Sequence, residues 1–582
     1  MCMKGRAGPE IIEASNRILY PMKRTNPKNA IAPGWVRISW EEALQTVASK
    51  LSQIRSESGA EAVAFAVTTK SGTAIGDSIE WIDRFVRVFG SPNVIGSTEI
   101  CNWHKDNAHK FTFGVAIPTA DYAHSELSIL WGHNPTSTWL AQSEAIAQGR
   151  KRGGKLIVVD PRPTPLASTA DVWLQVKPGT DAALALGFSH LLLSQSRYND
   201  EFVRNWTNSP LLVSKQTGLF LRGKDIWPDG NDSFVVWDKR SCAPRAYDTT
   251  MAAEGQGSSD FELDASLKID TLNGEDFCDT AFSLYRAQCA EWNPEKVEAV
   301  TGVSTEKLMQ AAELIGSSNK IAYHAWTGVG QGPNAAQTER AIATLYALRG
   351  CFDDVGCNRI YTKQPVNKVD KPDLIEKSQL AKAVGLSERP IGPPSEGRVK
   401  PTDVFRAIKS GRPYRIRAIL GFGTNHLATQ SDVEEIKAGL EQTEFHVHCD
   451  MIETPTARHA DIILPVSTPW ERESLRIGFE ISEDAENLIQ LRPAFVKARG
   501  ESRSDLEIVF ELACRLGFSK EFFGGSIEAG WNYMLAPLGF TVDDLRRNDY
   551  RMVRPLEHRN RKYAEIKDGK AVGFATETRR VE

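Results

Sequence analysis

Several short apolar runs in this sequence are each followed by a loop of glycine, asparagine or aspartate residues. Glycine lets backbone amides approach a phosphate closely, and the start of a helix favours negative charge. A carboxylate at the end of a strand can accept hydrogen bonds from a ribose or from a guanine edge. These loops therefore predict nucleotide binding, and their candidate residues are Gly132, Asn134, Asp160, Arg162, Gly179, Asp181, Gly328, Gly330, Gly423, Asn425 and Asp450.

Taken singly, each of these loops is a weak signal, because a turn between a strand and a helix commonly contains Gly or Asn. The loops fall into two groups, one before residue 200 and one after residue 320, which indicates two comparable nucleotide sites. None of them carries the full GxGxxG spacing or a Gly-Lys-Ser/Thr motif, so a simple NAD or ATP enzyme is disfavoured.

The nine cysteines are scattered along the chain and include no CxxC pair. This pattern argues against a disulfide framework and against a zinc ribbon, and it favours a reducing, cytoplasm-like compartment. On residue type alone, an isolated cysteine such as Cys101 is more typical of a small buried apolar side chain than of a ligand.

The elements that must position these loops alternate between short apolar runs and amphipathic helices. The runs at 127–131 and 155–159 are typical of buried strands. A helix is predicted to open at Ser39, with Glu42 completing a capping box, and to end before Gly59. Such alternation predicts parallel sheets covered by helices. Residues 225–275 have few long apolar runs and predict an irregular insertion.

Length and charge exclude several classes of protein. A chain of 582 residues is longer than one hydrophobic core usually supports, so two or more domains are expected. The net charge of −4 provides no general attraction to nucleic acid or to anionic membranes. No apolar run is long enough for a membrane helix, and the first ten residues contain no apolar signal region.

Seven strings in the sequence resemble, in this order, strings of the molybdopterin oxidoreductase family. The resemblance extends over nearly the whole chain and includes a cysteine, Cys101, between the third and fourth strings. The strings are CMKG at 2–5, RILYPMKR at 17–24, WVRISWEEA at 35–43, WGHN at 131–134, VDPR at 159–162, KPGTD at 177–181, and ADIILP at 460–465 followed by WE at 470–471.

This resemblance implies an α/β protein with two doubly wound, Rossmann-like parallel-sheet domains and a remnant of a smaller mixed domain. Members of the family carry molybdenum or tungsten on a bis(molybdopterin guanine dinucleotide) cofactor. Residues 36–97 with 318–450 would form the domain that binds one dinucleotide, and residues 98–317 the domain that binds the other. Residues 1–35 with 451–582 would form the remnant and a helical C-terminal segment.

By the same resemblance, Cys101 stands where the family supplies the protein ligand to the metal. Dithiolene sulfurs make a soft metal centre, and a thiolate suits such a centre as a further donor. One dinucleotide site would use the loop residues from Gly132 to Asp181, and the other would use those from Gly328 to Asp450. For any one of these residues, an ordinary role in a turn or a helix cap stays open.

The residues after Cys101 bear on the reaction. Asn102 stands where formate dehydrogenases have His, which counts against formate oxidation. His104 is a candidate proton donor or acceptor, because imidazole can titrate near neutrality. A structural hydrogen bond beside the cofactor is an equally fitting role for His104.

The two ends of the chain depart from the family pattern. Cys2 matches the fourth ligand of a 4Fe-4S cluster in relatives, but one cysteine cannot hold such a cluster. Lys4 matches a residue between cluster and pterin, and it is expected to contact the pterin. Residues 574–582 resemble the entrance to a final barrel domain, so both ends are expected to be truncated. The expected partners are a small-molecule substrate and an electron-transfer iron–sulfur subunit.

Three functions fit the resemblance. The first is a redox enzyme that transfers an oxygen atom or a hydride to or from a small substrate. The second is a non-redox hydratase on the same cofactor, and the third is a non-catalytic scaffold. The presence of Cys101 and of both groups of loops disfavours the scaffold.

Overall fold

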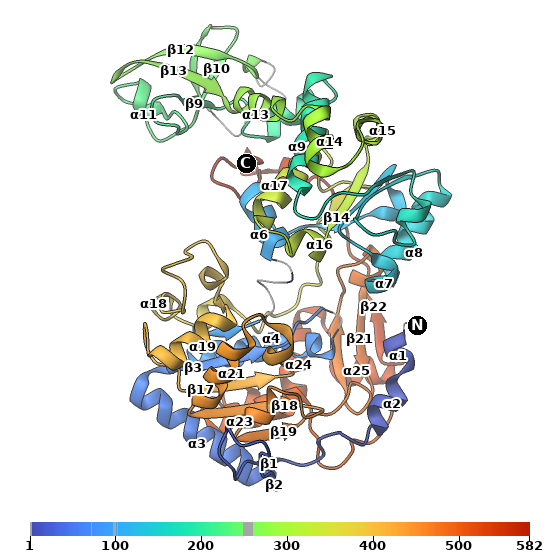
Figure 1. Ribbon diagram of the computed structural model, residues 1–582, viewed down its shortest axis with the longest axis vertical. Coiled ribbons are helices and arrows are strands. Elements are labelled where there is room, and N and C mark those ends of the chain that lie inside the picture. The colour runs from blue at the N-terminus through green and yellow to red at the C-terminus, as the bar shows by residue number, and fades with distance from the viewer. Residues whose placement is uncertain (1–2, 72, 97–100, 102, 248–259) are drawn as a thin grey trace. The chain divides into compact units, whose positions relative to one another are not determined.

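The computed structural model describes residues 3–71, 73–96, 101, 103–247 and 260–582. Its residues form two compact units (Figure 1). Unit 1 comprises Met1–Glu99, Lys363–Phe479 and Asp484–Leu556, and unit 2 comprises Ile100–Thr362, Glu480–Glu483 and Glu557–Glu582.

Unit 1 is built on an eight-stranded sheet in the order β16-β4-β3-β17-β18-β19-β1-β2. The strands from β16 to β19 pair in parallel, whereas β1 and β2 add an antiparallel edge. The strands are β16 (Arg398–Val399), β4 (Val94–Ile95), β3 (Val63–Val67), β17 (Ala418–Phe422), β18 (Phe445–Asp450), β19 (Ile462–Pro465), β1 (Met22–Lys23) and β2 (Val36–Arg37).

Helices cover both faces of this sheet. Alternate residues of a strand point to opposite faces, so residues 63, 65 and 67 of β3 join one apolar cluster while residues 64 and 66 join another. The first cluster includes side chains of α3 (Trp40–Ser58), α4 (Ile79–Phe89) and α23 (Asp505–Arg515), and the second includes those of α19 (Pro401–Ser410) and α21 (Val433–Gln442).

Local sequence signals determine where these helices begin and end. The Ser39 hydroxyl accepts the Glu42 amide at 3.1 Å and caps α3, which confirms the predicted start of that helix. Gly90 ends α4 in a left-handed conformation with φ +92°, which suits a residue without a side chain. Ser504 and Glu507 form a full capping box at the start of α23.

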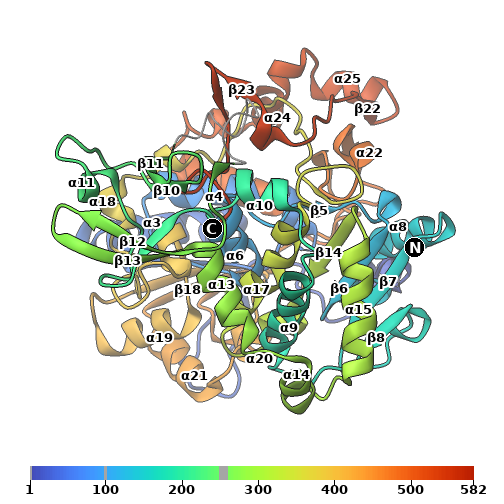
Figure 2. The same cartoon turned by 90° about the horizontal axis from the view of Figure 1, so that it is seen from above.

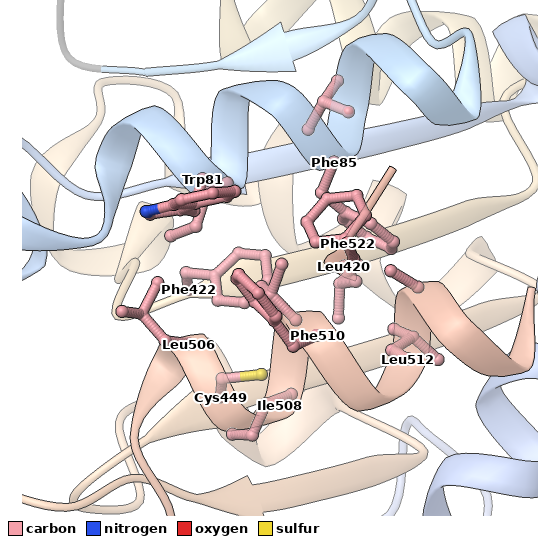
Figure 3. Close-up of a cluster of buried hydrophobic side chains, with 14 of the residues drawn as sticks. Trp81, Phe85, Leu420, Phe422, Cys449, Leu506, Ile508, Phe510, Leu512 and Phe522 are labelled. Atoms are coloured by element: carbon pink, nitrogen blue, oxygen red, sulfur yellow. The ribbon is translucent and has the colours of Figure 1, made fainter. Parts of the chain in front are cut away.

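The main core of unit 1 is aromatic. Phe510 of α23 lies 4.9 Å from the ring of Trp81 of α4 and 5.1 Å from that of Phe522, measured between ring centroids. Figure 3 shows these side chains pointing toward one another, with Cys449 of β18 beside them. Because Cys449 is fully buried among them, this cysteine has a structural place, as its isolated position in the sequence suggested.

Unit 2 contains a four-stranded parallel sheet in the order β14-β6-β7-β8. One face packs on α9, α15 and α17, and the other packs on α8. These elements and the helix that follows Cys101 are β14 (Ile321–Ala325), β6 (Leu127–Trp131), β7 (Lys155–Val159), β8 (Val172–Leu174), α6 (Trp103–Phe113), α8 (Leu140–Lys151), α9 (Asp181–Ser194), α15 (Thr305–Ser317) and α17 (Ala335–Arg349).

The described part of the segment expected to be an irregular insertion instead forms small antiparallel sheets. Strand β13 pairs with β12 and β9, and β10 pairs with β11, around a small core that includes Leu212, Val235 and Ile269. The hairpin of β12 and β13 lies at the periphery of unit 2 (Figure 2). The strands are β9 (Leu212–Ser214), β10 (Val235–Asp238), β11 (Ala243–Ala246), β12 (Ser266–Thr271) and β13 (Gly274–Thr280).

The remaining elements are shorter or lie outside the two parallel sheets. In unit 1 they include β20 (Ser474–Ile477), β21 (Leu488–Arg492), β22 (Arg551–Val553), α1 (Met3–Arg6), α2 (Gly8–Glu13), α20 (His426–Thr429), α24 (Ile527–Leu535) and α25 (Val542–Arg547). In unit 2 they include β5 (Thr119–Ala120), β15 (Asn358–Arg359), α7 (Pro135–Thr138), α10 (Asp200–Trp206), α13 (Ala281–Ala290), α14 (Pro294–Thr301) and α16 (Thr327–Gly330). Within the described ranges, helices are too short or too polar to cross a membrane.

The mixed α/β architecture with parallel sheets confirms the predicted fold class, but the units divide the chain differently from the predicted domains. Residues 318–362 were expected with 36–97; they lie in unit 2, because β14 pairs with β6 and α17 packs on the same face. The segment 1–35 was expected in a separate small domain, yet β1 pairs with β19 and extends the main sheet of unit 1.

The aromatic core yields the first prediction. Phe510→Ala removes a fully buried ring and is expected to lower the free energy of unfolding of unit 1 by about 3–5 kcal/mol. The matched control is Phe495→Ala, because Phe495 is 74% exposed and its removal is expected to cost less than about 0.5 kcal/mol. Thermal and denaturant unfolding of the three proteins measures both effects, and equal effects would contradict the assigned core.

Candidate functional site

The loop after β6 makes a sharp turn that returns to the neighbouring strand. Gly132 has φ +56°, a conformation that favours glycine, and its amide donates to the Val159 carbonyl at 2.8 Å. Asn134 then precedes the short helix α7, and its Oδ1 accepts the Thr136 hydroxyl at 2.6 Å. The polar atoms of this loop therefore gather at the carboxyl end of the sheet.

The loops after β7 and β8 lie at the same edge. Asp160 is buried and its Oδ1 accepts the Arg162 amide at 2.8 Å, while the Arg162 side chain is exposed. Gly179 has φ +84° and leads into α9, whose first residue is Asp181. The Trp131 indole donates to Asp181 Oδ1 at 2.7 Å, and burial raises the pKa of that carboxyl. This hydrogen bond joins the end of β6 to the start of α9.

The loop after β14 touches the loop after β6 through backbone alone. The Gly328 amide donates to the Gly132 carbonyl at 3.2 Å. A Cβ atom on Gly132 would lie 2.8 Å from Gly328 Cα, and a Cβ atom on Gly328 would lie 2.6 Å from Gly132 Cα. Gly330 lies equally close to the ring of His104, at 2.5 Å from a Cβ atom to Nδ1. These close approaches require glycine.

The structure therefore groups the predicted residues differently from the sequence. Gly328 and Gly330 were expected in one set with Gly423, Asn425 and Asp450. They lie in unit 2 beside Gly132, because β14 is the parallel neighbour of β6. Order along the chain did not reveal this, since the order of strands in a parallel sheet differs from their order in the sequence.

Unit 1 repeats the arrangement with its own residues. Gly423 after β17 has φ +61°, and its amide donates to the Cys449 carbonyl at 2.8 Å. Asn425 precedes the short helix α20, and its Oδ1 accepts the Thr456 hydroxyl at 3.1 Å. Asp450 ends β18 and accepts the amide of the next residue at 2.7 Å. Glycine, asparagine and aspartate thus occupy corresponding places in the two units.

The correspondence extends past the aspartate that ends each strand. A second aspartate, Asp171 in unit 2 and Asp461 in unit 1, follows it at the same separation in both units. Each accepts a strand amide: Asp171 from Leu156 at 2.9 Å, and Asp461 from His446 at 2.7 Å. An alignment of residues 155–174 with 445–464 would have revealed this internal repeat from the sequence. The two units therefore share a repeated arrangement of strand-end residues.

Cys101 and His104 lie near the start of α6. Cys101 is half-buried, and Asn102 lies outside the described residues. His104 is buried and hydrogen-bonds the backbone of Trp326, while its Nε2 has no hydrogen-bond partner among the described residues. Burial, helped by the charge of Lys105, lowers the pKa of His104 to about 4, so this imidazole is neutral at pH 7.

Two further histidines gather around Trp326, and the sequence reasoning did not single them out. The rings of His133 and His324 lie 5.7 and 4.9 Å from the Trp326 ring. His133 Nε2 bonds Gln142 at 2.7 Å, but neither nitrogen of His324 has a partner in the described part of the chain. The Lys105 ammonium lies 4.8 Å from the Trp326 ring centroid. His133 Nδ1 and both ring nitrogens of His324 are therefore available to hydrogen-bond a bound molecule or water.

The structure does not describe the side chains of two residues that were predicted to contact the iron–sulfur cluster or the pterin. Cys2 lies outside the described residues, and Lys4 lies in α1 with no description of its side chain. Their roles stay predictions.

Known proteins with related sequences decide the family. The molybdopterin oxidoreductase family profile matches residues 17–515. This chain belongs to the molybdopterin oxidoreductase family. Acetylene hydratase of Syntrophotalea acetylenica is 23% identical over 94% of this chain and 67% of its own length. Dopamine dehydroxylase of Eggerthella lenta is 24% identical over 89% of this chain and 59% of its own length.

Two further similarities agree with this membership. The thiosulfate reductase molybdopterin-containing subunit PhsA of Salmonella typhimurium is 24% identical over 94% of this chain and 63% of its own length. The solved acetylene hydratase from Pelobacter acetylenicus superposes with a TM-score of 0.77 at 22% identity, over the whole of this chain and 71% of that one, and shows the shared fold. The chain spans 59 to 67% of the length of the curated relatives named above.

The family's cofactor is a pterin that carries molybdenum or tungsten, and the residues of this molybdopterin oxidoreductase fit it. Glycines lie at the strand ends in both units. Buried imidazole nitrogens without partners among the described residues lie near the start of α6. Within the described ranges, His, Cys, Asp and Glu side chains form no group of three or more able to hold a metal ion. A metal held mainly by cofactor sulfurs fits this donor set.

The contact between Gly132 and Gly328 yields the second prediction. Gly132→Ala incurs the left-handed backbone cost of about 1–2 kcal/mol and, in addition, a clash with the neighbouring backbone worth about 1–3 kcal/mol. Gly153→Ala is the matched control, because Gly153 has φ +95° and its Cβ atom would meet no described atom within 4 Å. The measurements are thermal unfolding and bound metal per chain. Equal losses of thermal stability and of bound metal in both variants would show that the close contact between Gly132 and Gly328 does not require glycine.

Proposed function

We propose that this chain is the pterin-binding part of a molybdenum- or tungsten-dependent oxidoreductase that transfers an oxygen atom or a hydride to or from a small substrate. The observation that carries the proposal is the matched set of strand-end loops in the two units, together with Cys101 near the start of α6. Matched loops suit a cofactor with two like halves, such as a bis(molybdopterin guanine dinucleotide).

In this proposal each unit binds one guanine dinucleotide. Backbone amides beside the glycines contact the phosphates, because the amides of Gly132, Gly328 and Gly423 already donate to carbonyl groups. The strand-end carboxylates accept hydrogen bonds from guanine or ribose. One site uses Gly423, Asn425 and Asp450 of unit 1. The other uses the residues of unit 2, now including the loop after β14: Gly132, Asn134, Asp160, Arg162, Gly179, Asp181, Gly328 and Gly330.

Cys101 is the proposed protein ligand to the metal. When bound, the pterin and its metal supply the redox chemistry. The thiolate of Cys101 adds negative charge and a soft donor, which tunes the potential of such a centre. Electrons are proposed to pass to or from an iron–sulfur partner.

His104 is the proposed base of the site. Its hydrogen bond to the Trp326 backbone raises the imidazole pKa and so opposes the effect of burial, as a bond donated to a carbonyl does. The donated proton is on Nδ1, so Nε2 of the neutral ring carries the lone pair. That nitrogen can accept a proton from a substrate or from water.

A hydratase is the second candidate function, favoured by the similarity to acetylene hydratase over 94% of this chain. In that reaction no electrons enter or leave. Turnover of the metal-loaded protein in the absence of any electron donor or acceptor would support the hydratase, whereas dependence on a redox dye supports the oxidoreductase.

The proposed metal ligand yields the third prediction. Cys101→Ala is expected to abolish turnover while most of the pterin stays bound, because the dinucleotide contacts do not involve this residue. Cys514→Ala is the matched control, since Cys514 is also half-buried but lies in α23 of unit 1. Turnover, bound metal and bound guanine are measured on the same preparations. Turnover of Cys101→Ala at the level of the Cys514→Ala control would remove Cys101 from the proposed site.

A further inference from the structure

A buried carboxyl group lies between α6, β14 and α17, and the reaction proposed above does not use it. Glu339 of α17 is completely buried. Its Oε1 lies 3.5 Å from the Tyr323 hydroxyl of β14 and 3.7 Å from His109 Nδ1 of α6. Its Oε2 has no hydrogen-bond partner among the described residues. Burying a carboxylate so completely is costly unless a cation pairs with it or the group holds a proton.

The hydrogen bonds of this cluster fix where each proton lies. His109 Nδ1 lies 2.8 Å from the Lys105 carbonyl, which can only accept, so Nδ1 carries a proton. Burial lowers the pKa of His109 to about 4, and the neutral ring therefore has a lone pair on Nε2. The Tyr323 hydroxyl bonds this Nε2 and must be the donor. The Tyr323 oxygen is then free to accept from Glu339.

Burial also determines whether the carboxyl group of Glu339 is protonated. It raises the pKa of this carboxyl to about 8, against the opposing charge of Lys105 and with the help of Asp106. Glu339 is therefore protonated at pH 7 and donates toward Tyr323. The resulting chain of donors runs in one direction, from Glu339 through Tyr323 to His109, and ends on α6.

A second arrangement of the same atoms differs only in where the protons lie. If the carboxyl proton passes to the Tyr323 oxygen while the Tyr323 proton passes to His109 Nε2, the products are a carboxylate and an imidazolium. One O–H bond of Glu339 breaks and one N–H bond of His109 forms, and Tyr323 exchanges one proton for another. The carboxylate and the imidazolium then face each other across the 3.7 Å between Oε1 and Nδ1.

We propose that Glu339, Tyr323 and His109 form a proton store for the reaction at Cys101, in which a proton moves from α17 to α6 when the charge near the start of α6 becomes more negative. His109 lies about 9 Å along the axis from Trp103, the first residue of α6. At that distance through a buried interior, a charge is only partly screened. This inference rests on the proposed function, which supplies the change of charge.

The fourth prediction uses variants that keep the volume of the cluster. Tyr323→Phe removes the bridging hydroxyl, and Glu339→Gln keeps a donor toward Tyr323 but cannot release a proton. Both variants are expected to lower kcat by about 10²-fold and to lose the alkaline limb that is expected near pH 8 in the wild type. KM is expected to stay unchanged, because the cluster does not contact substrate.

Tyr346→Phe is the matched control for Tyr323→Phe. Tyr346 of α17 stacks on Tyr323 at 3.5 Å between ring centroids, but its hydroxyl has no hydrogen-bond partner within the described residues. The control variant is expected to keep the kcat and the pH profile of the wild type. A purely structural cluster would leave the pH profile of Tyr323→Phe like that of the control, and that result would overturn the proton store.

Infrared spectroscopy tests the store without any turnover. The wild type is expected to show the band of a protonated carboxyl at pH 7 that disappears above about pH 8 and that is absent in Glu339→Gln. Lack of this band at pH 7 would overturn the store whatever the activity. Lack of any metal-dependent turnover in the wild type would instead overturn the proposed function and the link to Cys101, and the infrared band would then still report the state of Glu339.

Discussion

The parallel pairing of strands is the constraint on which the rest of this structure depends. In each unit it brings the carboxyl ends of successive strands to one edge of a sheet, although the strands are far apart in the sequence. The loops at that edge must then pack against one another. In unit 2 this packing is so close that Gly132 and Gly328 meet backbone to backbone. Glycine is there because any side chain would clash with the neighbouring backbone.

The two units have the same arrangement of residues in their strand-end loops. Glycine in the left-handed region, asparagine before a four-residue helix and aspartate at the end of the next strand recur in both, and so does the second aspartate that accepts a strand amide. The predicted binding residues lie in loops, whereas the apolar clusters consist mainly of strand and helix residues, so each unit has its own core.

The elements of the fold could be predicted from the sequence where short local patterns determine them. The cap of α3 by Ser39 and the strands around 127–131 and 155–159 follow from short patterns, and the structure has them where expected. The partners of Gly328 could not be predicted in this way, because strand order is a property of the whole sheet. Glu339 was also missed, since a glutamate in a helix is usually a solvated residue and only its neighbours reveal that it is buried.

In the proposed function, each unit binds one guanine dinucleotide of the metal cofactor. The measurement that tests it most directly is the amount of guanine and of metal released from the purified wild-type protein, each divided by the amount of chain. The account predicts one molybdenum or tungsten atom and two guanines per chain. A preparation that carries the metal with a single guanine, or with none, would contradict it.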